Sequence, residues 1–384
     1  MGSVRRPKDE RGSRGWEARY RDHSGRQRSR TFRTKREADR FLERVGADLQ
    51  RGDWLDPTLQ RTKFGEWAGE WRASIVHLEP NTIAFYDTML RHHVLPAFAD
   101  RTIGTIDQAV MRRFVAELVA AGAGARTVQG AFQTVRHVMT TAQGSGAIKA
   151  NPCDRIKLPR LGQRECVFLA PDQVLELADA IRPPYGVLVT FAAYGGMRAG
   201  EIGGLRVGRL DLLRRQVDVV EALKDVNGRL SFGPTKNHGR RTVRLPPFLC
   251  ELLGEYLADR PKRANDLVFT APEGGPLQHR VFYRRYFRPA IEAAGLPAAV
   301  RFHDLRHTCA AFLIAQGAHP RAIMERLGHS SITVTLNTYG HLFPSLDEAL
   351  TDGLETTYRS SVATRTRPDG HAASVSELRP ATVR

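Results

Sequence analysis

The alternation of apolar and polar side chains predicts a β-hairpin near the N-terminus. The alternation covers residues 16–33 and surrounds a turn at Ser24 and Gly25. A helical pattern begins at Thr34, with Glu37 three residues further on in the spacing of a capping box. The apolar stripe of this helix consists of Ala38, Phe41, Leu42 and Val45. The pattern therefore predicts a small sheet packed on one helix.

Helical periodicity dominates residues 62–157. The predicted helices are residues 64–76, 81–93, 107–121 and 126–142, which are separated by Pro96, Gly122 and Gly124. Four short helices of this kind form a compact bundle. The stretch that follows is basic and contains two prolines, which is typical of an extended linker.

The pattern changes class beyond residue 170. Helical runs at 171–181 and 187–194 lead to three strand-like runs, QVDVVEAL, RLSFG and RTVRLP, and helices return from residue 248. This order predicts a mainly helical α+β domain with a small antiparallel sheet. Residues after 361 are polar and aperiodic, which predicts a disordered tail. The predicted multidomain layout is a sheet-plus-helix unit at 1–60, an all-α bundle at 61–157, a linker at 158–164, the α+β domain at 165–360 and a tail at 361–384.

The net charge indicates a polyanionic partner. Lys and Arg outnumber Asp and Glu by 58 to 41 in 384 residues, which gives a formal charge of +17. A charge of this size, spread along the chain, favours nucleic acid as the partner. A membrane surface would attract the same charge, but no segment has the roughly 18 uninterrupted apolar residues of a spanning helix. The first fifteen residues also lack the apolar run of a signal peptide, so we expect a cytoplasmic protein.

Arginines are concentrated in the N-terminal unit. A basic sheet of this kind is suited to a DNA groove, and a solvated charged surface is the equally balanced alternative. The arginines that we predict to contact DNA are Arg19, Arg21, Arg28, Arg30 and Arg33. The four cysteines of the chain are scattered and form no CxxC pair, which favours reduced thiols over disulfides or zinc ligands.

Residues 301–342 combine five histidines with several arginines and one tyrosine. His303 and His307 are four residues apart, as in helical metal-binding pairs. However, Arg306 shares their helix face and no third ligand stands nearby in the sequence, which argues against a metal. A basic helix whose histidines cap or pack is the better of these two interpretations.

Five motifs follow one another in a distinctive order: MRAGE, GPTKNHGRR, HDLRH, LGHSS and NTYGH. Their order and spacing resemble the tyrosine recombinases, the phage-integrase family. The helical region, with NTIAFYDTMLRHHVLPAF, looks like the core-site DNA-binding domain of that family, a SAM-like bundle. The N-terminal unit looks like the arm-binding domain of phage and mobile-element integrases.

The resemblance implies a set of catalytic residues. Tyr339 in NTYGH matches the nucleophile, and Glu201 matches the carboxylate that orients the first catalytic arginine. The register of the hairpin lysine stays open, because Lys224 is also in the hairpin region. The implied catalytic residues are Arg198, Lys236, His303, Arg306, His329 and Tyr339.

The same residue types suit the chemistry of a phosphodiester. Attack adds negative charge to the phosphate oxygens, and two fixed guanidiniums, Arg198 and Arg306, can stabilise that charge. A phenol has a pKa of about 10, so Tyr339 needs a proton acceptor, for which we predict His303. Lys236 is suited to protonate the departing 5′ oxygen, and His329 to donate a hydrogen bond to the phosphate. With this much positive charge we expect no metal and no cofactor.

The resemblance therefore predicts a site-specific DNA recombinase, the integrase of a phage or integrative element. The predicted partners are double-stranded DNA attachment sites and a homotetramer on DNA, with an accessory excision factor and a host architectural protein as further candidates. The alternatives are a non-catalytic DNA-binding protein on a recombinase scaffold, a Xer-like resolvase and a type IB topoisomerase. Each residue taken singly also has a structural interpretation, such as a salt bridge between Arg198 and Glu201. Five coincidences in family order favour catalysis.

Overall fold

The computed structural model describes residues 2–6, 15–22, 25–51, 54–162, 165–236, 239–258, 263–343 and 347–365. The chain divides into two compact units, of which the first comprises residues 1–165 and 226–229 and the second comprises residues 166–225 and 230–384. Ser24, Asn237, His238, Ser345 and residues 366–384 of the predicted tail lie outside the described residues. Residues 361–365 of that tail form the end of the last helix, which corrects the predicted start of the tail. No helix within the described ranges is long and apolar enough to cross a membrane.

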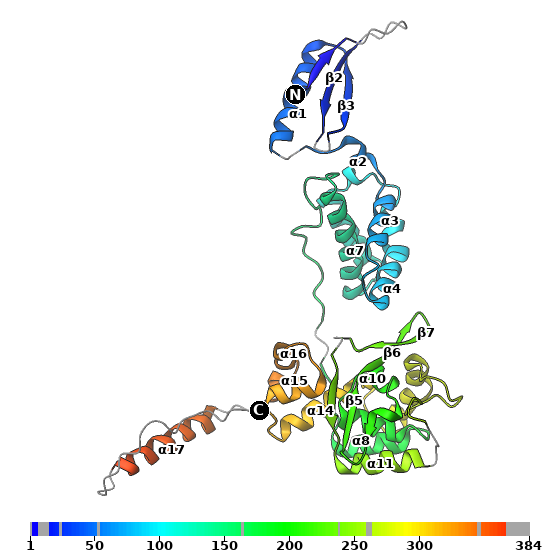
Figure 1. Cartoon of the computed structure of the whole chain (residues 1–384), viewed down its shortest axis with the longest axis vertical. Helices are drawn as coiled ribbons and strands as arrows, with labels where there is room; N and C mark the ends of the chain where they lie inside the picture. Colours follow the sequence, from blue (N-terminus) through cyan, green and yellow to red (C-terminus); the bar gives the residue numbers. More distant parts are fainter. Residues whose placement is uncertain are drawn as a thin grey trace. The chain divides into compact units, whose positions relative to one another are not determined.

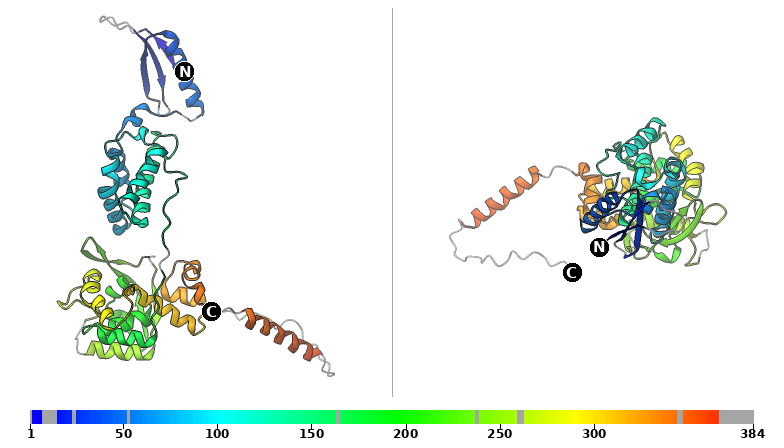
Figure 2. Two further views of the ribbon diagram at one scale, coloured as in Figure 1. Left: turned by 180° about the vertical axis from the view of Figure 1, so that it is seen from behind. Right: turned by 90° about the horizontal axis from the view of Figure 1, so that it is seen from above.

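The first unit opens with an antiparallel sheet of order β1-β2-β3, one face of which is covered by α1 (Figures 1 and 2). Ala18 and Tyr20 on β2 are buried against Ala38 and Val45 on α1. The capping box at the start of α1 is confirmed, because Thr34 N–H donates to Glu37 and Glu37 N–H donates to Thr34 Oγ1. The bounds are β1 (Ser3–Arg5), β2 (Trp16–Arg21), β3 (Gln27–Phe32) and α1 (Lys35–Arg51).

The remainder of the first unit is a helical bundle. Its core contains Phe64, Trp71, Phe98, Phe114 and Phe132, which are contributed by several helices. The elements are α2 (Pro57–Arg61), α3 (Phe64–Ser74), α4 (Pro80–Met89), η1 (Leu90–Val94), α5 (Leu95–Phe98), η2 (Ile103–Thr105), α6 (Gln108–Ala120) and α7 (Ala125–Gly144).

Pro96 does not end its helix, which corrects the predicted break. Proline has no N–H to donate to the preceding turn. The chain widens into a π-turn at η1, where Leu95 N–H donates to Leu90 O, and then continues as α5. A π-turn of the same kind precedes Pro289 in the second unit, where η4 (Tyr283–Phe287) leads into α13 (Arg288–Ala293).

The second unit surrounds two small sheets with helices. One sheet has the antiparallel order β4-β5-β8, and β6 pairs with β7 through a tight turn at Asn227 and Gly228, both with positive φ. The predicted single strand QVDVVEAL is therefore wrong, because its two halves, β5 and β6, belong to different sheets. The strands are β4 (Leu210–Asp211), β5 (Gln216–Val219), β6 (Glu221–Val226), β7 (Arg229–Pro234) and β8 (Arg241–Arg244).

The helices of the second unit supply its core and carry the motifs. Helix α9 is apolar all round and lies against α8, α11 and α14. The remaining elements are α8 (Pro171–Ala180), α9 (Gly186–Gly195), α10 (Ala199–Gly203), η3 (Val207–Arg209), α11 (Pro247–Ala258), α12 (His279–Phe282), α14 (Phe302–Ala315), α15 (Pro320–Leu327), α16 (Ile332–Tyr339), η5 (Gly340–Leu342) and α17 (Asp347–Arg365).

Candidate active site

Arg198 is placed by the sharp turn between α9 and α10. Gly196 ends α9 in the left-handed conformation, and a Cβ there would lie 2.9 Å from Cys309 Sγ and from Leu327 Cδ2, so glycine is required. Arg198 then caps α10. Its backbone N–H donates to Glu201 at 2.9 Å and its Nη1 donates to the same carboxylate at 2.8 Å. The Glu201 side chain is 1% exposed, so it holds Arg198 from within the protein.

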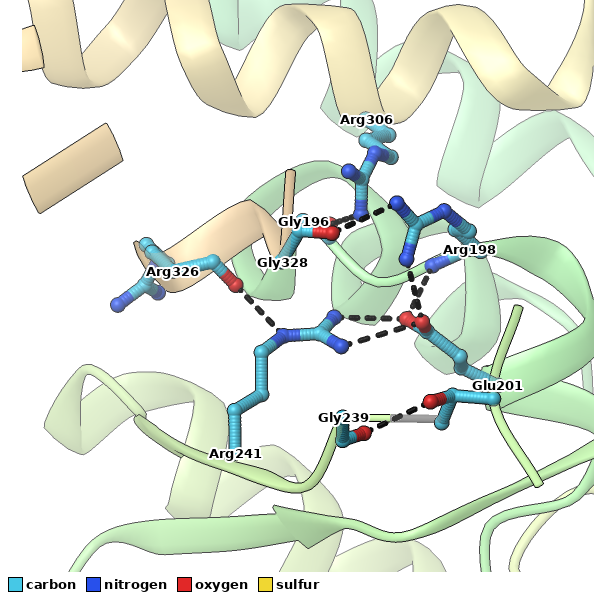
Figure 3. Close-up of polar contacts among 9 residues, drawn as sticks. Gly196, Arg198, Glu201, Gly239, Arg241, Arg306, Arg326 and Gly328 are labelled. Carbon is cyan, nitrogen blue, oxygen red and sulfur yellow. Dashed lines mark hydrogen bonds and ion pairs between the residues drawn. The ribbon is translucent and has the colours of Figure 1, made fainter. Parts of the chain in front are cut away.

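Arg241 is a member of this cluster that sequence reasoning missed. From β8 it binds both oxygens of Glu201, with Nη1 at 3.1 Å and Nη2 at 2.7 Å (Figure 3). Its Nε also donates to the backbone oxygen of Arg326 at 2.9 Å. Burial alone would raise the pKa of the Glu201 carboxyl, but the hydrogen bonds and charges of Arg241 and Arg198 lower it overall.

Arg306 brings a second guanidinium to the same place. It is buried on α14, and its Nη1 donates to Gly196 O at 2.8 Å, while Arg198 Nη2 donates to Gly328 O at 2.8 Å. Figure 3 shows the Arg198 and Arg306 guanidiniums next to each other. Desolvation, together with the positive charge of Arg198, lowers the pKa of Arg306 to about 10. Arg306 therefore stays charged at neutral pH, and the pair forms a fixed site for an anion.

Tyr339 ends α16 with its side chain almost completely buried. It packs with Ala310, Ile314, Ile323 and Leu327. Burial raises the pKa of the phenol well above its usual value, although the positive charge of Arg306 opposes this shift. The phenol oxygen lies 2.8 Å from Nδ1 of His307. His307 is a second residue that had no predicted role in the reaction.

His303 lies next to His307, and His329 lies next to Tyr339. The His303 ring is edge-on to the His307 ring, with centroids 4.9 Å apart, and part of its surface is open to solvent. The protein packed around it, together with the charges of His307 and Arg306, still lowers the pKa of His303 to about 4. Burial, followed by the charges of Arg306 and Arg198, likewise lowers the pKa of His329 to about 4. His329 Nδ1 lies 2.8 Å from Thr335 Oγ1, which fixes the ring.

Lys236 is exposed on the turn between β7 and β8. Thr235 Oγ1 donates to Gly239 O at 2.7 Å and closes this turn. A cavity of about 300 Å³ borders the turn, lined by Thr235, Gly239, Arg198, Arg241, Gly328 and His329. The structure therefore places the Lys236 turn beside Arg198 and His329. Among the described side chains, no group of three His, Cys, Asp or Glu residues could hold a metal ion.

The five arginines predicted to contact DNA are divided between the two faces of the N-terminal sheet. Arg30 lies over the rings of Phe32 and Phe41, on the face that α1 covers. Arg28 on the same face is bound to Asp22 and Asp56. Strand pairing places Arg19 and Arg21, with alternate residues of β2, on the opposite, open face. Arg33 follows β3 and is exposed.

Two family models match the chain. Residues 167–345 match the phage integrase family, and residues 63–119 match the N-terminal SAM-like domain of phage integrases. The putative prophage phiRv2 integrase of Mycobacterium tuberculosis is 28% identical over 348 residues, which cover 87% of this chain and 91% of that protein. The ICEBs1 integrase of Bacillus subtilis is 26% identical over 291 residues, which cover 72% of this chain and 78% of that protein.

Solved structures show the same fold. The Tn1549 transposon integrase in complex with transposon right end DNA has a TM-score of 0.66 at 18% identity, over 76% of this chain and 98% of that one. A lambda integrase dimer bound to a COC′ core site has a TM-score of 0.56 at 16% identity, over 87% of this chain and 95% of that one.

Proposed function

Because the chain belongs to the phage integrase family of site-specific tyrosine recombinases, we propose that it integrates and excises a prophage or mobile element by cutting and rejoining double-stranded DNA at attachment sites. One observation carries the proposal. The guanidiniums of Arg198 and Arg306 lie side by side on fixed carbonyl contacts, and Arg306 is close enough to influence the phenol of Tyr339. An anion-binding pair beside a tyrosine is suited to attack on a phosphodiester.

In the proposed cleavage step the two arginines bind the non-bridging oxygens of the scissile phosphate. The oxygen of Tyr339 attacks phosphorus, the bond to the 5′ oxygen breaks, and the DNA is held as a 3′-phosphotyrosyl ester. Fixed guanidiniums favour this step because they stabilise the charge that grows on the phosphate oxygens in the transition state. The two guanidiniums do not have to reorient during the reaction, since hydrogen bonds to Glu201, Gly196 and Gly328 already hold them in place.

Three proton-carrying residues complete the proposed site. Lys236 protonates the departing 5′ oxygen from its turn beside the cavity. His329 donates to the phosphate through Nε2, because Thr335 occupies Nδ1. His303 is the sequence-based prediction for the acceptor of the tyrosine proton. In the joining step a 5′ hydroxyl attacks the phosphotyrosyl ester, whose bond energy is preserved, so the proposed reaction uses neither ATP nor a metal.

The N-terminal sheet is the proposed arm-site contact, and the bundle at 61–157 is the proposed core-site contact. On the sheet, the open face that carries Arg19 and Arg21 is the surface suited to a DNA groove. Arg28 and Arg30 are less suited to this role, because strand pairing places them on the face that α1 covers. On the open face, Arg19 is ion-paired with Glu17 and Arg21 donates to Gly25 O at 2.8 Å. Phosphate contacts from exposed arginines position a protein on DNA without reading its sequence.

Assembly as a homotetramer on DNA is proposed to use α17. Leu354 is 72% exposed and Tyr358 67% exposed, and they lie one helical turn apart. A lambda integrase tetramer bound to a Holliday junction has a TM-score of 0.55 with this chain. Truncation after Phe343, which keeps the residues packed around Tyr339, should spare folding and covalent adduct formation but abolish synapsis, measured by the size of the protein–DNA complex. A truncated protein that fails to fold would instead place α17 in the core of its own unit.

A nicked suicide DNA that carries the attachment site tests the proposed function. The site is obtained from the junction of the circular element or from the direct repeat that flanks its gene. The wild-type chain should form a covalent protein–DNA adduct in EDTA, and Tyr339→Phe should bind the same DNA without forming an adduct. Retardation of the DNA without an adduct by the wild type would mean binding alone.

A further inference from the structure

The phenol of Tyr339 has a defined partner inside the protein. Its oxygen lies 2.8 Å from His307 Nδ1, within normal hydrogen-bond range. The two side chains come from different helices, α14 and α16, and their rings meet edge to face with centroids 5.7 Å apart. Helix α15 packs against both helices and closes the apolar cluster around the tyrosine. The contact is therefore set by tertiary packing and not by a flexible surface side chain.

Building on the proposed function, we propose that His307 is a catalytic residue that orients the Tyr339 phenol and accepts its proton when the oxygen attacks DNA. His303, one helical turn earlier, is the residue that the sequence favours for this role. However, the His303 ring contacts the His307 ring edge-on, with centroids 4.9 Å apart, and part of its surface is open to solvent. His307 is the histidine whose nitrogen lies at hydrogen-bond distance from the reacting oxygen.

The protonation states around His307 suit an acceptor. Desolvation lowers the pKa of His307, and Arg301 and Arg306 lower it further, against Asp304, which raises it. A histidine with a lowered pKa is neutral at pH 7 and has one nitrogen without a proton. The phenol, whose pKa is raised by burial, keeps its proton at this pH. The remaining titratable groups near this pair are His303, His329, Cys166 and Cys309.

The proposed step balances its protons. As the bond between the Tyr339 oxygen and phosphorus forms, the phenol O–H bond breaks and the proton moves to His307 Nδ1, which becomes an imidazolium with its second proton on Nε2. The bond from phosphorus to the 5′ oxygen breaks in the same step, and that oxygen takes a proton from Lys236. In the joining step the incoming 5′ hydroxyl gives up its proton to Lys236, and His307 returns its proton to the tyrosine oxygen.

Two substitutions separate acceptance of the proton from positioning. His307→Asn keeps a hydrogen-bonding atom near the place of Nδ1 but cannot take up a proton. His307→Ala removes both functions and leaves space for imidazole. The measurement is the single-turnover rate of adduct formation on nicked suicide DNA from pH 6 to 9.5. His303→Ala is the comparison variant, since it removes the other histidine ring that is a candidate for the same role, one helical turn away.

The proposal predicts that both His307 variants bind DNA normally and form adduct about 10²-fold more slowly at pH 7. Their rates should rise with pH, because solvent hydroxide replaces the missing acceptor, and added imidazole should accelerate His307→Ala. A rate of His307→Asn equal to the wild type would overturn proton acceptance. A pH-independent loss without imidazole rescue would overturn it as well, and so would the same pH dependence appearing in His303→Ala.

The two proposals fail in different ways. If the wild type forms no adduct, the recombinase assignment of this chain fails. If the wild type forms an adduct that Tyr339→Phe abolishes while His307→Ala and His307→Asn react normally, the assignment of His307 alone is overturned. Circular dichroism melting of each variant separates a folding defect from a chemical one, and His307→Asn, which retains a polar partner for the phenol, keeps the test open if His307→Ala does not fold.

Discussion

Arg241 binds both oxygens of the buried Glu201 carboxylate, although the two residues are 40 positions apart in the chain. Glu201 in turn holds Arg198, and Arg241 also binds the backbone at the end of α15, next to Gly328. Arg241 begins β8, directly after the turn that carries Lys236. The ion-pair cluster of Arg241, Glu201 and Arg198 thus connects the Lys236 turn with α15, the helix that precedes His329 (Figure 3).

Removal of Arg241 should destabilise the second unit. Arg241→Ala would leave the Glu201 carboxylate buried with half of its partners, and breaking a buried pair costs about 3 kcal/mol. The unfolding free energy of Arg241→Lys should lie between those of the wild type and Arg241→Ala, because an ammonium cannot bind both oxygens as the guanidinium fork does. The neighbouring Arg240→Ala, an exposed position, should change stability by less than about 0.5 kcal/mol. Urea unfolding measures all three, and equal losses for Arg240→Ala and Arg241→Ala would contradict the cluster.

Glu201 should also give the unit a characteristic acid sensitivity. The pKa of this carboxyl is lower in the folded state than in the unfolded chain. Its contribution to the free energy of unfolding is therefore fully present above the unfolded-state pKa of about 4.3, and it is lost as the pH falls through the folded-state pKa. Glu201→Gln should therefore be less stable than the wild type at pH 7, and the difference should shrink at pH values below about 4. Unfolding free energies measured between pH 7 and pH 3 test this, and a constant difference at every pH would argue against it.

Local patterns predicted much of the fold and the candidate site. The capping spacing of Thr34 and Glu37 indicated a helix start, and the His-x-x-Arg motif placed His303 and Arg306 on one helix. Arg30 was predicted to contact DNA, but it shares the sheet face of Phe32, whose ring packs on Phe41 of α1.

Other features depend on contacts between distant segments. The partner of Tyr339 is decided by how α14 packs on α16, which the local pattern that predicted His303 does not contain. The role of Arg241 depends on the approach of β8 to α10. The run QVDVVEAL has strand-forming residues in both halves, so its sequence does not show where it divides. The division arises because β5 pairs with β4 and β8, whereas β6 pairs with β7.

Lys236 should be dispensable when the leaving group needs no proton. Replacing the bridging 5′ oxygen with sulfur makes the leaving group a thiolate, whose conjugate acid has a pKa of about 8.5, as for cysteine. Lys236→Ala should be strongly impaired on normal DNA and largely rescued on the sulfur substrate. Arg198→Ala should be impaired on both, because it no longer stabilises the phosphate. Equal impairment of Lys236→Ala on the two substrates would reduce Lys236 to a phosphate contact.

The open face of the N-terminal sheet should account for arm-site affinity. The double variant Arg19→Ala, Arg21→Ala should bind arm DNA more weakly, and the slope of log affinity against log salt should fall by about 0.9 for each phosphate that is no longer neutralised. Arg36→Ala, Arg40→Ala removes the same charge from exposed positions on α1 and serves as the control. Core-site cleavage should be unchanged in both. An equal effect of the two double variants would indicate net charge and not a defined surface.

Removing residues 1–60 should separate cleavage from integration. The proposed active-site residues lie downstream, so the shortened chain should still form adducts on core DNA. Integration between complete attachment sites should fall, because the proposed arm-binding surface is absent. Recombination assays with full and arm-less attachment sites measure both. A shortened chain that recombines as well as the full one would show that the arm-binding role is wrong.

The residue and the DNA end joined in the covalent intermediate test the central claim most directly. The adduct formed on nicked suicide DNA is digested with protease and nuclease, and the modified peptide is sequenced by mass spectrometry. The account predicts a nucleotide linked through its 3′ phosphate to Tyr339, in the peptide that ends α16. Attachment to Tyr358 or to any other residue, or a link through a 5′ phosphate, would contradict it.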